Sequence, residues 1–134
     1  MIEHSKLKAL VVDDSEISRR IICRIIAEAF NYEEAENGLI GLHKYQEAVE
    51  SGEPYDLVFM DVIMPEMDGK ETVREIRSYE VSRGRQKTPI IMVTASEMID
   101  EIEELVNGLL RKVVNKKLLE PLLQALFKGN IDSL

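Results

Sequence analysis

Five polar side chains in this 134-residue sequence follow short apolar runs, at the points where the runs end. They are three carboxylates, a hydroxyl and an ammonium, from Asp13, Asp14, Asp61, Thr94 and Lys112. Apolar runs of this length without polar alternation are typical of strands buried on both faces of a parallel sheet. Because ligands bind at the carboxyl ends of such strands, we expect these side chains to converge at one sheet edge.

Asp61 follows an apolar run over residues 57–60 and precedes a turn over residues 65–69 that opens the next helix. A lone Asp after a strand is often only a cap for that turn or helix, and by itself Asp61 leaves this interpretation open. The presence of Asp13 and Asp14 at the end of another apolar run favours a shared acidic site.

Hydrophobic periodicity predicts five strands that alternate with five helices. The strands are expected at residues 7–12, 32–36, 57–60, 89–93 and 108–111, with the second weak and at an edge. The helices are expected after Ser15 and over residues 39–49, 70–83, 98–106 and 118–126, the first with an apolar stripe from Ile17 to Ala29.

This alternation implies right-handed crossovers and a parallel sheet with helices on both faces. The alternation alone leaves the strand order open. We expect a flavodoxin-like (βα)5 sandwich with a five-stranded parallel sheet in the order 2-1-3-4-5. This order makes the first and third strands neighbours, which brings Asp13, Asp14 and Asp61 together.

The composition fits a single domain over residues 1–134, with a core that needs no disulfide or structural metal. Lys and Arg number 17 against 25 Asp and Glu, and the net charge of -8 disfavours nucleic acid and anionic membranes as partners. The single cysteine, Cys23, is expected in the core. No segment approaches the roughly 18 apolar residues of a membrane span, and no signal peptide precedes the first strand, so we expect a cytoplasmic protein.

Three carboxylates within a few ångströms of one another raise each other's pKa unless a cation neutralises them. A set of oxygen ligands indicates Mg²⁺, and His4 and His43 are expected at the surface rather than as ligands. With a divalent ion beside it, Asp61 has the chemistry of an oxygen nucleophile towards phosphorus. Thr94 and Lys112 supply the hydroxyl and ammonium that a phosphoryl group's other oxygens need.

Taken together, the motifs resemble the receiver domain of response regulators in two-component signalling, over nearly the whole chain. The residues that carry the resemblance are Asp13-Asp14, Asp61, Met64-Pro65, Asp68-Gly69, Thr94-Ala95 and Lys112. Each motif is weak alone, but together, in this order along the expected strands and turns, they are specific. The resemblance implies that Asp61 is the phosphoacceptor, and that the Mg²⁺ ligands are Asp61, Asp14, Asp13 through water and the backbone carbonyl of Ile63.

The resemblance also implies that Thr94 and Lys112 hold the phosphoryl oxygens and that Thr94 moves inward when Asp61 is modified. In this family the phosphoryl donor is a phosphohistidine of a sensor or hybrid histidine kinase, or of a histidine phosphotransfer protein. Since no effector domain is expected in residues 1–134, output would pass to a downstream protein partner. A monomer or weak dimer is expected, because the apolar residues at 118–126 are assigned to the core.

The chain departs from the family pattern at Lys112. Val113 follows it, where the family usually has a proline joined by a cis peptide bond. A cis bond before a non-proline residue costs roughly 3 kcal/mol, so a trans bond is expected unless the surrounding packing enforces a cis bond, and a trans bond would change the aim of Lys112. Leu109 stands where the family commonly has an aromatic residue that moves with the threonine.

The segment between Thr94 and Lys112 is shorter than in the family by about four residues, or one helical turn, which predicts a stunted fourth helix. The positions two residues after the phosphoacceptor and two after the threonine influence access of hydrolytic water in this family. Here they are Ile63 and Ser96, and neither is an acid or amide that could orient water. Slow self-dephosphorylation is therefore expected.

Three functional hypotheses follow from these features. The first is a phosphorylatable receiver that acts as a signalling switch or phosphoryl shuttle. The second is a degenerate receiver that works as an unphosphorylated binding module; Val113, Leu109 and the short fourth helix favour it, whereas the retained acid pair argues against it. The third, an aspartyl-phosphate phosphatase, is disfavoured because that enzyme class would place a second acid where Ile63 stands.

Overall fold

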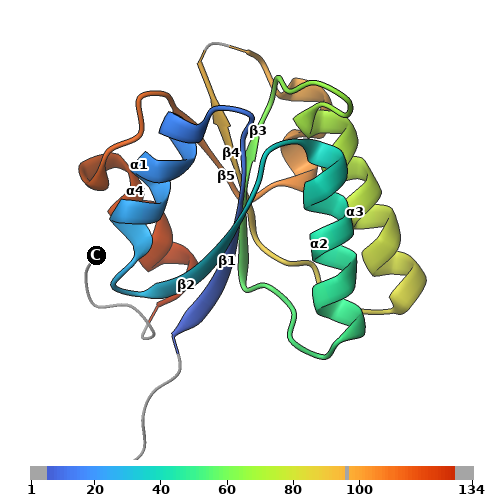
Figure 1. Ribbon diagram of the computed structural model, residues 1–134. Helices are drawn as coiled ribbons and strands as arrows, with labels where there is room; N and C mark the ends of the chain where they lie inside the picture. The colour runs from blue at the N-terminus through green and yellow to red at the C-terminus, as the bar shows by residue number, and fades with distance from the viewer. Residues whose placement is uncertain (1–5, 96, 129–134) are drawn as a thin grey trace, which may run out of the picture.

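The computed structural model describes residues 6–95 and 97–128. Its strands form one parallel sheet in the order β2-β1-β3-β4-β5, which confirms the expected flavodoxin-like order (Figure 1). The elements along the chain are β1 (Leu7–Val12), α1 (Glu16–Ile26), β2 (Phe30–Ala35), α2 (Gly38–Glu50), β3 (Leu57–Asp61), α3 (Gly69–Arg83), β4 (Ile90–Thr94), the 3-10 helix η1 (Asp100–Leu105), β5 (Gly108–Arg111) and α4 (Lys116–Leu126).

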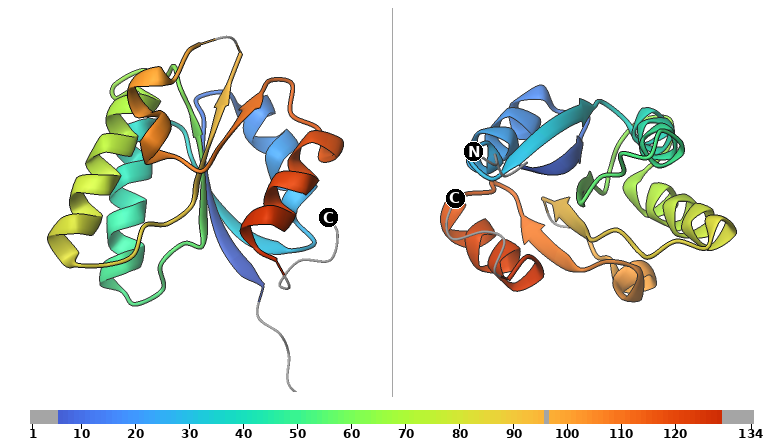
Figure 2. Two further views of the ribbon diagram at one scale, coloured as in Figure 1. Left: turned by 180° about the vertical axis from the view of Figure 1, so that it is seen from behind. Right: turned by 90° about the horizontal axis from the view of Figure 1, so that it is seen from below.

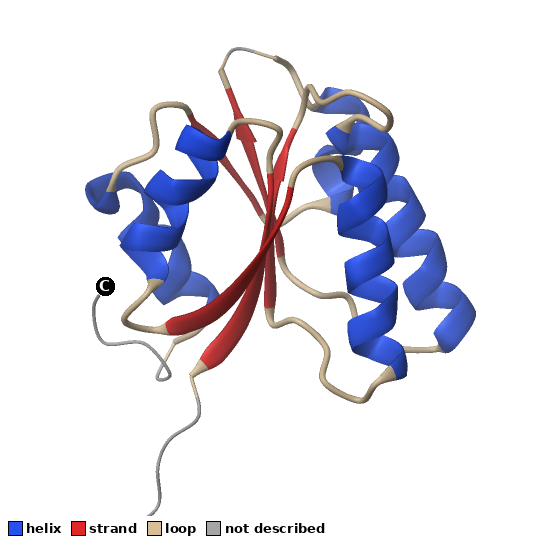
Figure 3. Cartoon of the chain, viewed as in Figure 1, coloured by secondary structure: helices blue, strands red, loops and turns tan. Residues whose placement is uncertain are grey.

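Helices cover both faces of the sheet. Helices α1 and α4 lie on one face, and α2, α3 and η1 lie on the other (Figures 1 and 2). Colouring by secondary structure shows the same three layers, with the strands in the middle (Figure 3). The loops that leave the carboxyl ends of β1, β3, β4 and β5 gather at the upper edge in Figure 1.

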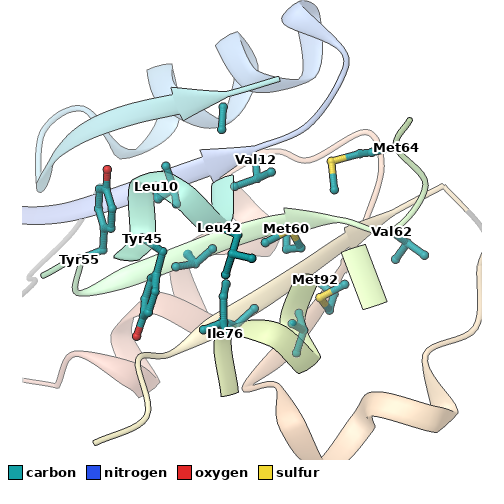
Figure 4. Close-up of a cluster of buried hydrophobic side chains, with 14 of the residues drawn as sticks. Leu10, Val12, Leu42, Tyr45, Tyr55, Met60, Val62, Met64, Ile76 and Met92 are labelled. Carbon is teal, nitrogen blue, oxygen red and sulfur yellow. The ribbon is translucent and has the colours of Figure 1, made fainter. Parts of the chain in front are cut away.

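Each face of the sheet has its own buried core, because side chains alternate along every strand. On β1, Leu10 and Val12 face the α2 and α3 side, where they join Tyr45 and Ile76 (Figure 4). The opposite cluster lies beneath α1 and α4 and includes Cys23, which is buried as expected. Strands β3 and β4 are buried along their whole length, which is the pattern predicted for central strands of a parallel sheet.

Three details of the predicted helices were wrong. Helix α1 ends at Ile26, and Ile17 is 73% exposed rather than part of the buried stripe. The reason is position: the first turn of α1 lies at the carboxyl edge of the sheet, beside Val113, and not over the sheet itself. The fourth of the five helices is a 3-10 helix, so the described residues contain four α-helices.

The shortening of this fourth element was predicted correctly. Six residues, Asp100–Leu105, form η1, and only Ile102 among them is buried. The weak second strand is an edge strand, as expected, but it begins earlier, at Phe30, whose ring packs edge-on against Phe127. In α4, Leu119 and Leu123 are buried as expected, but Leu118, which was assigned to the core with them, is 51% exposed. None of the helices within the described residues is both long enough and apolar enough to cross a membrane.

Candidate functional site

Three carboxylates meet at the carboxyl edge of the sheet, as the sequence predicted. Asp13 and Asp14 follow β1, Asp61 ends β3, and these two strands are paired with Val12 opposite Met60. Each carboxylate offers one oxygen, and these oxygens all lie within 4.8 Å of one another. Asp13 and Asp61 are buried, whereas Asp14 is exposed, so the cluster opens to solvent on one side.

The turn after β1 is fixed by hydrogen bonds to Asp13. The backbone N–H of Ser15 donates to Asp13 Oδ1 at 2.8 Å, and the Ser15 hydroxyl caps α1 by accepting from the N–H of Ser18. Arg19, one turn into α1, donates from its guanidinium to the carbonyl oxygen of Asp13 at 2.7 Å. The start of α1 therefore holds both the backbone and the side chain of the first acid in place.

The turn after β3 depends on a glycine. The N–H of Gly69 donates to the carbonyl of Val62 at 2.7 Å, and a Cβ at position 69 would lie 1.9 Å from the carbonyl oxygen of Asp61. Asp68 precedes it and caps α3 by accepting from the N–H of Glu71. The Asp-Gly pair thus brings the start of α3 directly against the residue that carries the third carboxylate.

Lys112 reaches into the acidic cluster. Its ammonium lies 3.0 Å from Asp13 Oδ2 and 3.5 Å from Asp61 Oδ1. The expectation of a trans bond to Val113 was wrong, because the Lys112–Val113 peptide bond is cis. The trans expectation held only if the surrounding packing did not enforce a cis bond, and here Lys112 makes these two ion-pair contacts and donates its backbone N–H to the carbonyl of Thr94.

Thr94 ends β4, the strand next to β3, and is fully buried. Its hydroxyl donates to a carboxylate oxygen of Glu97, and the backbone N–H of Glu97 donates back to Thr94 Oγ1 at 2.9 Å. The sequence analysis placed Thr94 at the correct edge but missed Glu97. The spacing Thr-x-x-Glu, typical of a capping box, was the signal that could have found it.

Burial and neighbouring charge alter the protonation of this site. Burial, together with the negative charge of Asp13, raises the pKa of Asp61 to about 7, although Lys112 opposes the shift. Burial lowers the pKa of Lys112, but its hydrogen bond to Asp13 and the charges of Asp13 and Asp61 outweigh that and leave it raised. One ammonium faces three carboxylates, which leaves an excess of negative charge at neutral pH.

The donor set fits Mg²⁺. Among the described residues, the Lys112 ammonium at 3.0 Å is the one polar neighbour that the buried Asp13 Oδ2 has. Three carboxylates that share one ammonium, in a cluster open to water on one side, suit a hard divalent cation that keeps several waters. His43 is exposed on α2, away from this cluster.

The predicted roles of three other residues are not tested by the structure. Ile63 is 61% exposed in the loop after β3, and the part of its backbone carbonyl in metal binding stays a prediction. Ser96 and His4 lie outside the described residues.

Residues 9–128 match the response regulator receiver domain family. The two-component response regulator ORR41 of Oryza sativa subsp. japonica is 34% identical over 106 residues, which cover 76% of each chain. Histidine kinase CKI1 of Arabidopsis thaliana is 37% identical over 100 residues, but this match covers only 9% of the kinase. The chain therefore spans most of one relative and a small part of another.

Solved structures of receiver domains are also similar to this chain. The receiver domain of CKI1 complexed with Mg²⁺ and BeF₃⁻ is 30% identical, with a TM-score of 0.74, and the match covers 90% of this chain and 89% of that one. A chain from the co-crystal of the Saccharomyces cerevisiae phosphotransfer protein Ypd1 with the receiver domain of Ssk1 is 26% identical, with a TM-score of 0.73 and coverage of 85% and 83%. Because the family model matches residues 9–128 and solved receiver domains share the fold, the chain belongs to the response regulator receiver domain family.

Proposed function

We propose that this receiver domain accepts a phosphoryl group on Asp61 from a phosphohistidine, in a reaction that requires Mg²⁺. The observation that carries the proposal is the convergence of three carboxylates within 4.8 Å, with the Lys112 ammonium 3.5 Å from Asp61. The CKI1 receiver, which was crystallised with Mg²⁺ and BeF₃⁻, supports it by similarity.

The metal would be held by Asp61, by Asp14 directly, by Asp13 through water and by the backbone carbonyl of Ile63. When bound, Mg²⁺ offsets the negative charge of the carboxylates and of the incoming phosphoryl oxygens. An oxygen of Asp61 then forms a bond to phosphorus while the bond from phosphorus to the imidazole nitrogen breaks. The imidazole nitrogen keeps the electron pair of that bond.

Lys112 and Thr94 would contact the phosphoryl oxygens that face the protein. Lys112 already points at Asp61, and its charge favours the phosphorylated state over the free carboxylate. Thr94 lies on the adjacent strand, and its hydroxyl has to turn from Glu97 to reach the same group.

The donor would be a histidine kinase or a histidine phosphotransfer protein, and output would pass to a protein partner through surface contacts. The co-crystal of Ypd1 with the Ssk1 receiver supports this class of donor by similarity. The particular donor and the downstream partner are not specified by the site.

The test uses the purified protein with Mg²⁺ and either acetyl phosphate or beryllofluoride. Intact mass should increase by one phosphoryl group, or amide signals near Asp13, Asp14 and Thr94 should shift in a saturable way. Both effects should require Mg²⁺ and disappear in Asp61→Asn. If the folded wild-type protein shows neither effect, the alternative of a receiver that works as an unphosphorylated binding module takes its place.

The phosphorylated form should be long-lived. Ile63, the exposed aliphatic residue two positions after Asp61, offers no group to orient a water molecule for attack. After removal of the phosphodonor, the loss of the added mass should take many minutes. Decay within seconds in the purified protein would contradict this expectation.

A further inference from the structure

Thr94 and Glu97 form a closed pair of hydrogen bonds at the carboxyl end of β4. The Thr94 hydroxyl donates to the Glu97 carboxylate, and the Glu97 backbone N–H donates to the same hydroxyl oxygen at 2.9 Å. A hydroxyl has one hydrogen to donate. While the Thr94 hydroxyl donates this hydrogen to Glu97, it cannot donate to an acceptor at Asp61.

Helix capping does not explain this pair. The spacing Thr-x-x-Glu belongs to the capping box, in which the threonine begins an α-helix. Here the next helical element is η1, which begins only at Asp100, and its own cap residue, Ile99, makes no side-chain capping bond. The pair therefore secures the Thr94 side chain itself rather than the end of a helix.

The charge of Glu97 also makes the pair strong. Hydrogen bonds to an ionised acceptor are roughly twice as strong as those between neutral groups. A phosphoryl group on Asp61 would present oxygens of the same type, negatively charged and able to accept from the Thr94 hydroxyl. Glu97 and the phosphoryl group would therefore compete for the one hydrogen of Thr94.

We propose that Glu97 is a positioning residue that holds the Thr94 hydroxyl turned away from Asp61 until a phosphoryl group displaces it. This inference rests on the proposed phosphorylation of Asp61. Release of Glu97 would then be the first structural event that follows phosphorylation, in a chain that has Leu109 where an aromatic partner of the threonine would stand.

The neighbouring structure limits how far this event spreads. One end of η1 is tied to α3 by the ion pair of Lys70 with Glu101 at 2.7 Å. The other end is tied to α3 by Arg77, whose guanidinium donates to the carbonyl of Leu105 at 2.8 Å. The change that follows release of Glu97 should therefore be concentrated in the short segment between β4 and η1.

The experiment measures the affinity of the protein for beryllofluoride in the presence of Mg²⁺, and separately its affinity for Mg²⁺ alone. The variants are Glu97→Ala, Glu97→Gln and the control Glu103→Gln, which removes the same charge from an exposed position on η1. Glu97→Ala should bind beryllofluoride about three- to tenfold more tightly than wild type, because one charged hydrogen bond no longer competes. Glu97→Gln, whose amide oxygen still accepts, should show a smaller gain.

Two further readouts separate this role from a general effect of charge or packing. The affinity for Mg²⁺ should be the same in all variants within about twofold, because the three carboxylates are untouched. The gain from Glu97→Ala should vanish in a Thr94→Ala background, since no hydroxyl is then held. Equal beryllofluoride affinity in Glu97→Ala and wild type, or an undiminished gain without Thr94, would overturn the proposal.

The same data distinguish failure of this inference from failure of the proposed function. If wild type binds beryllofluoride and Glu97→Ala binds it no better, only the role of Glu97 is rejected. If wild type does not bind it but Glu97→Ala does, Glu97 blocks the site and the inference stands. Binding by neither protein would reject both proposals.

Discussion

The residues around Asp61 have opposing effects on its pKa. The carboxyl group is buried beside Asp13, which disfavours its charge, while the Lys112 ammonium favours it. The first two influences win in the metal-free protein and raise the pKa to about 7. The carboxylate that we propose as the nucleophile is thus kept in an environment that destabilises its charge, and a cation would offset that effect.

The raised pKa of Asp61 predicts how the stability of the metal-free protein depends on pH. Native Asp61 keeps its proton up to a pKa of about 7, whereas the unfolded chain releases it near 3.8. The native state therefore binds more protons between these values, so the free energy of unfolding should fall as the pH rises through this range. Asp61→Asn should remove that contribution and be more stable at pH 8 by about 1 kcal/mol, a reduced figure because solvent screens the cleft.

Urea unfolding with a chelator at pH 5 and pH 8 checks this prediction. Asp100→Asn, an exposed acid on η1, is the matched control and should behave like wild type. Magnesium added at pH 8 should reduce the difference between wild type and Asp61→Asn. The interpretation fails if the two proteins lose stability equally between the two pH values.

At the scale of single residues, sequence analysis found the groups but not all of their contacts. Asp13, Asp14 and Asp61 were predictable because they lie at the carboxyl ends of two buried strands, and strand ends fix position. The contact of Thr94 with Glu97 was not, because it depends on how the chain turns after β4. The aim of Lys112 could not be predicted, because it depends on contacts with Asp13 and Asp61 that the preference of its peptide bond does not reveal.

At the scale of elements, the short turn before α3 and the contacts of α3 with neighbouring segments fix the position of the acidic site. Gly69 lets the start of α3 approach the backbone of Asp61. Arg77 contacts the carbonyls of Thr88, just before β4, and Leu105, at the end of η1, and so holds the other half of α3. Element positions were predictable from apolar periodicity, whereas the 3-10 form of η1 was not, because six residues are too few for that periodicity to distinguish helix types.

Gly69→Ala should disturb the site more than its small size suggests. The added Cβ would lie 1.9 Å from the Asp61 carbonyl oxygen, which is backbone and cannot turn aside. We expect a loss of stability of about 3 kcal/mol, from overpacking and backbone shift. Gly52→Ala is the control, because its Cβ meets nothing and only its positive φ is unfavourable, at a cost of about 1 kcal/mol. Thermal or urea unfolding of the two variants compares them, and equal losses would contradict the argument.

Arg77 should be the most important charged residue for stability on α3. Its guanidinium contacts Glu80 Oε1 and the carbonyls of Thr88 and Leu105, all at 2.8 Å, and both members of the Arg77–Glu80 pair are buried. Arg77→Met would leave the Glu80 charge buried without its cation, so a loss of about 3 to 5 kcal/mol is expected.

The control for this variant lies on the same helix. Arg83→Met breaks a half-exposed ion pair with Glu50 and should cost under about 1 kcal/mol. Urea unfolding of both variants tests the difference, and similar losses would mean that burial of the Arg77 pair contributes little.

At the scale of the whole molecule, the acidic edge of the sheet is also where the proposed protein donor would approach. Its surroundings are partly apolar: Ile17 at the start of α1 and Val113 after β5 are each 73% exposed and line one hollow together with Lys112. The exposure of these two side chains was not predicted from the sequence. Ile17 fits the apolar stripe of α1, and only the fold shows that its turn extends beyond the core.

A donor that brings a phosphohistidine to Asp61 would cover this apolar surface, because Lys112 both lines the hollow and contacts Asp61. Ile17→Asp should therefore slow phosphoryl transfer from a phosphotransfer protein about tenfold or more, as expected for a charge placed in an apolar contact. The rate with acetyl phosphate should stay unchanged, because a small donor needs no docking surface. Val81→Asp, at a residue that is 79% exposed on α3, should alter neither rate. Equal slowing with both donors would instead mean that Ile17 acts on the site itself, through the start of α1 that holds Asp13 in place.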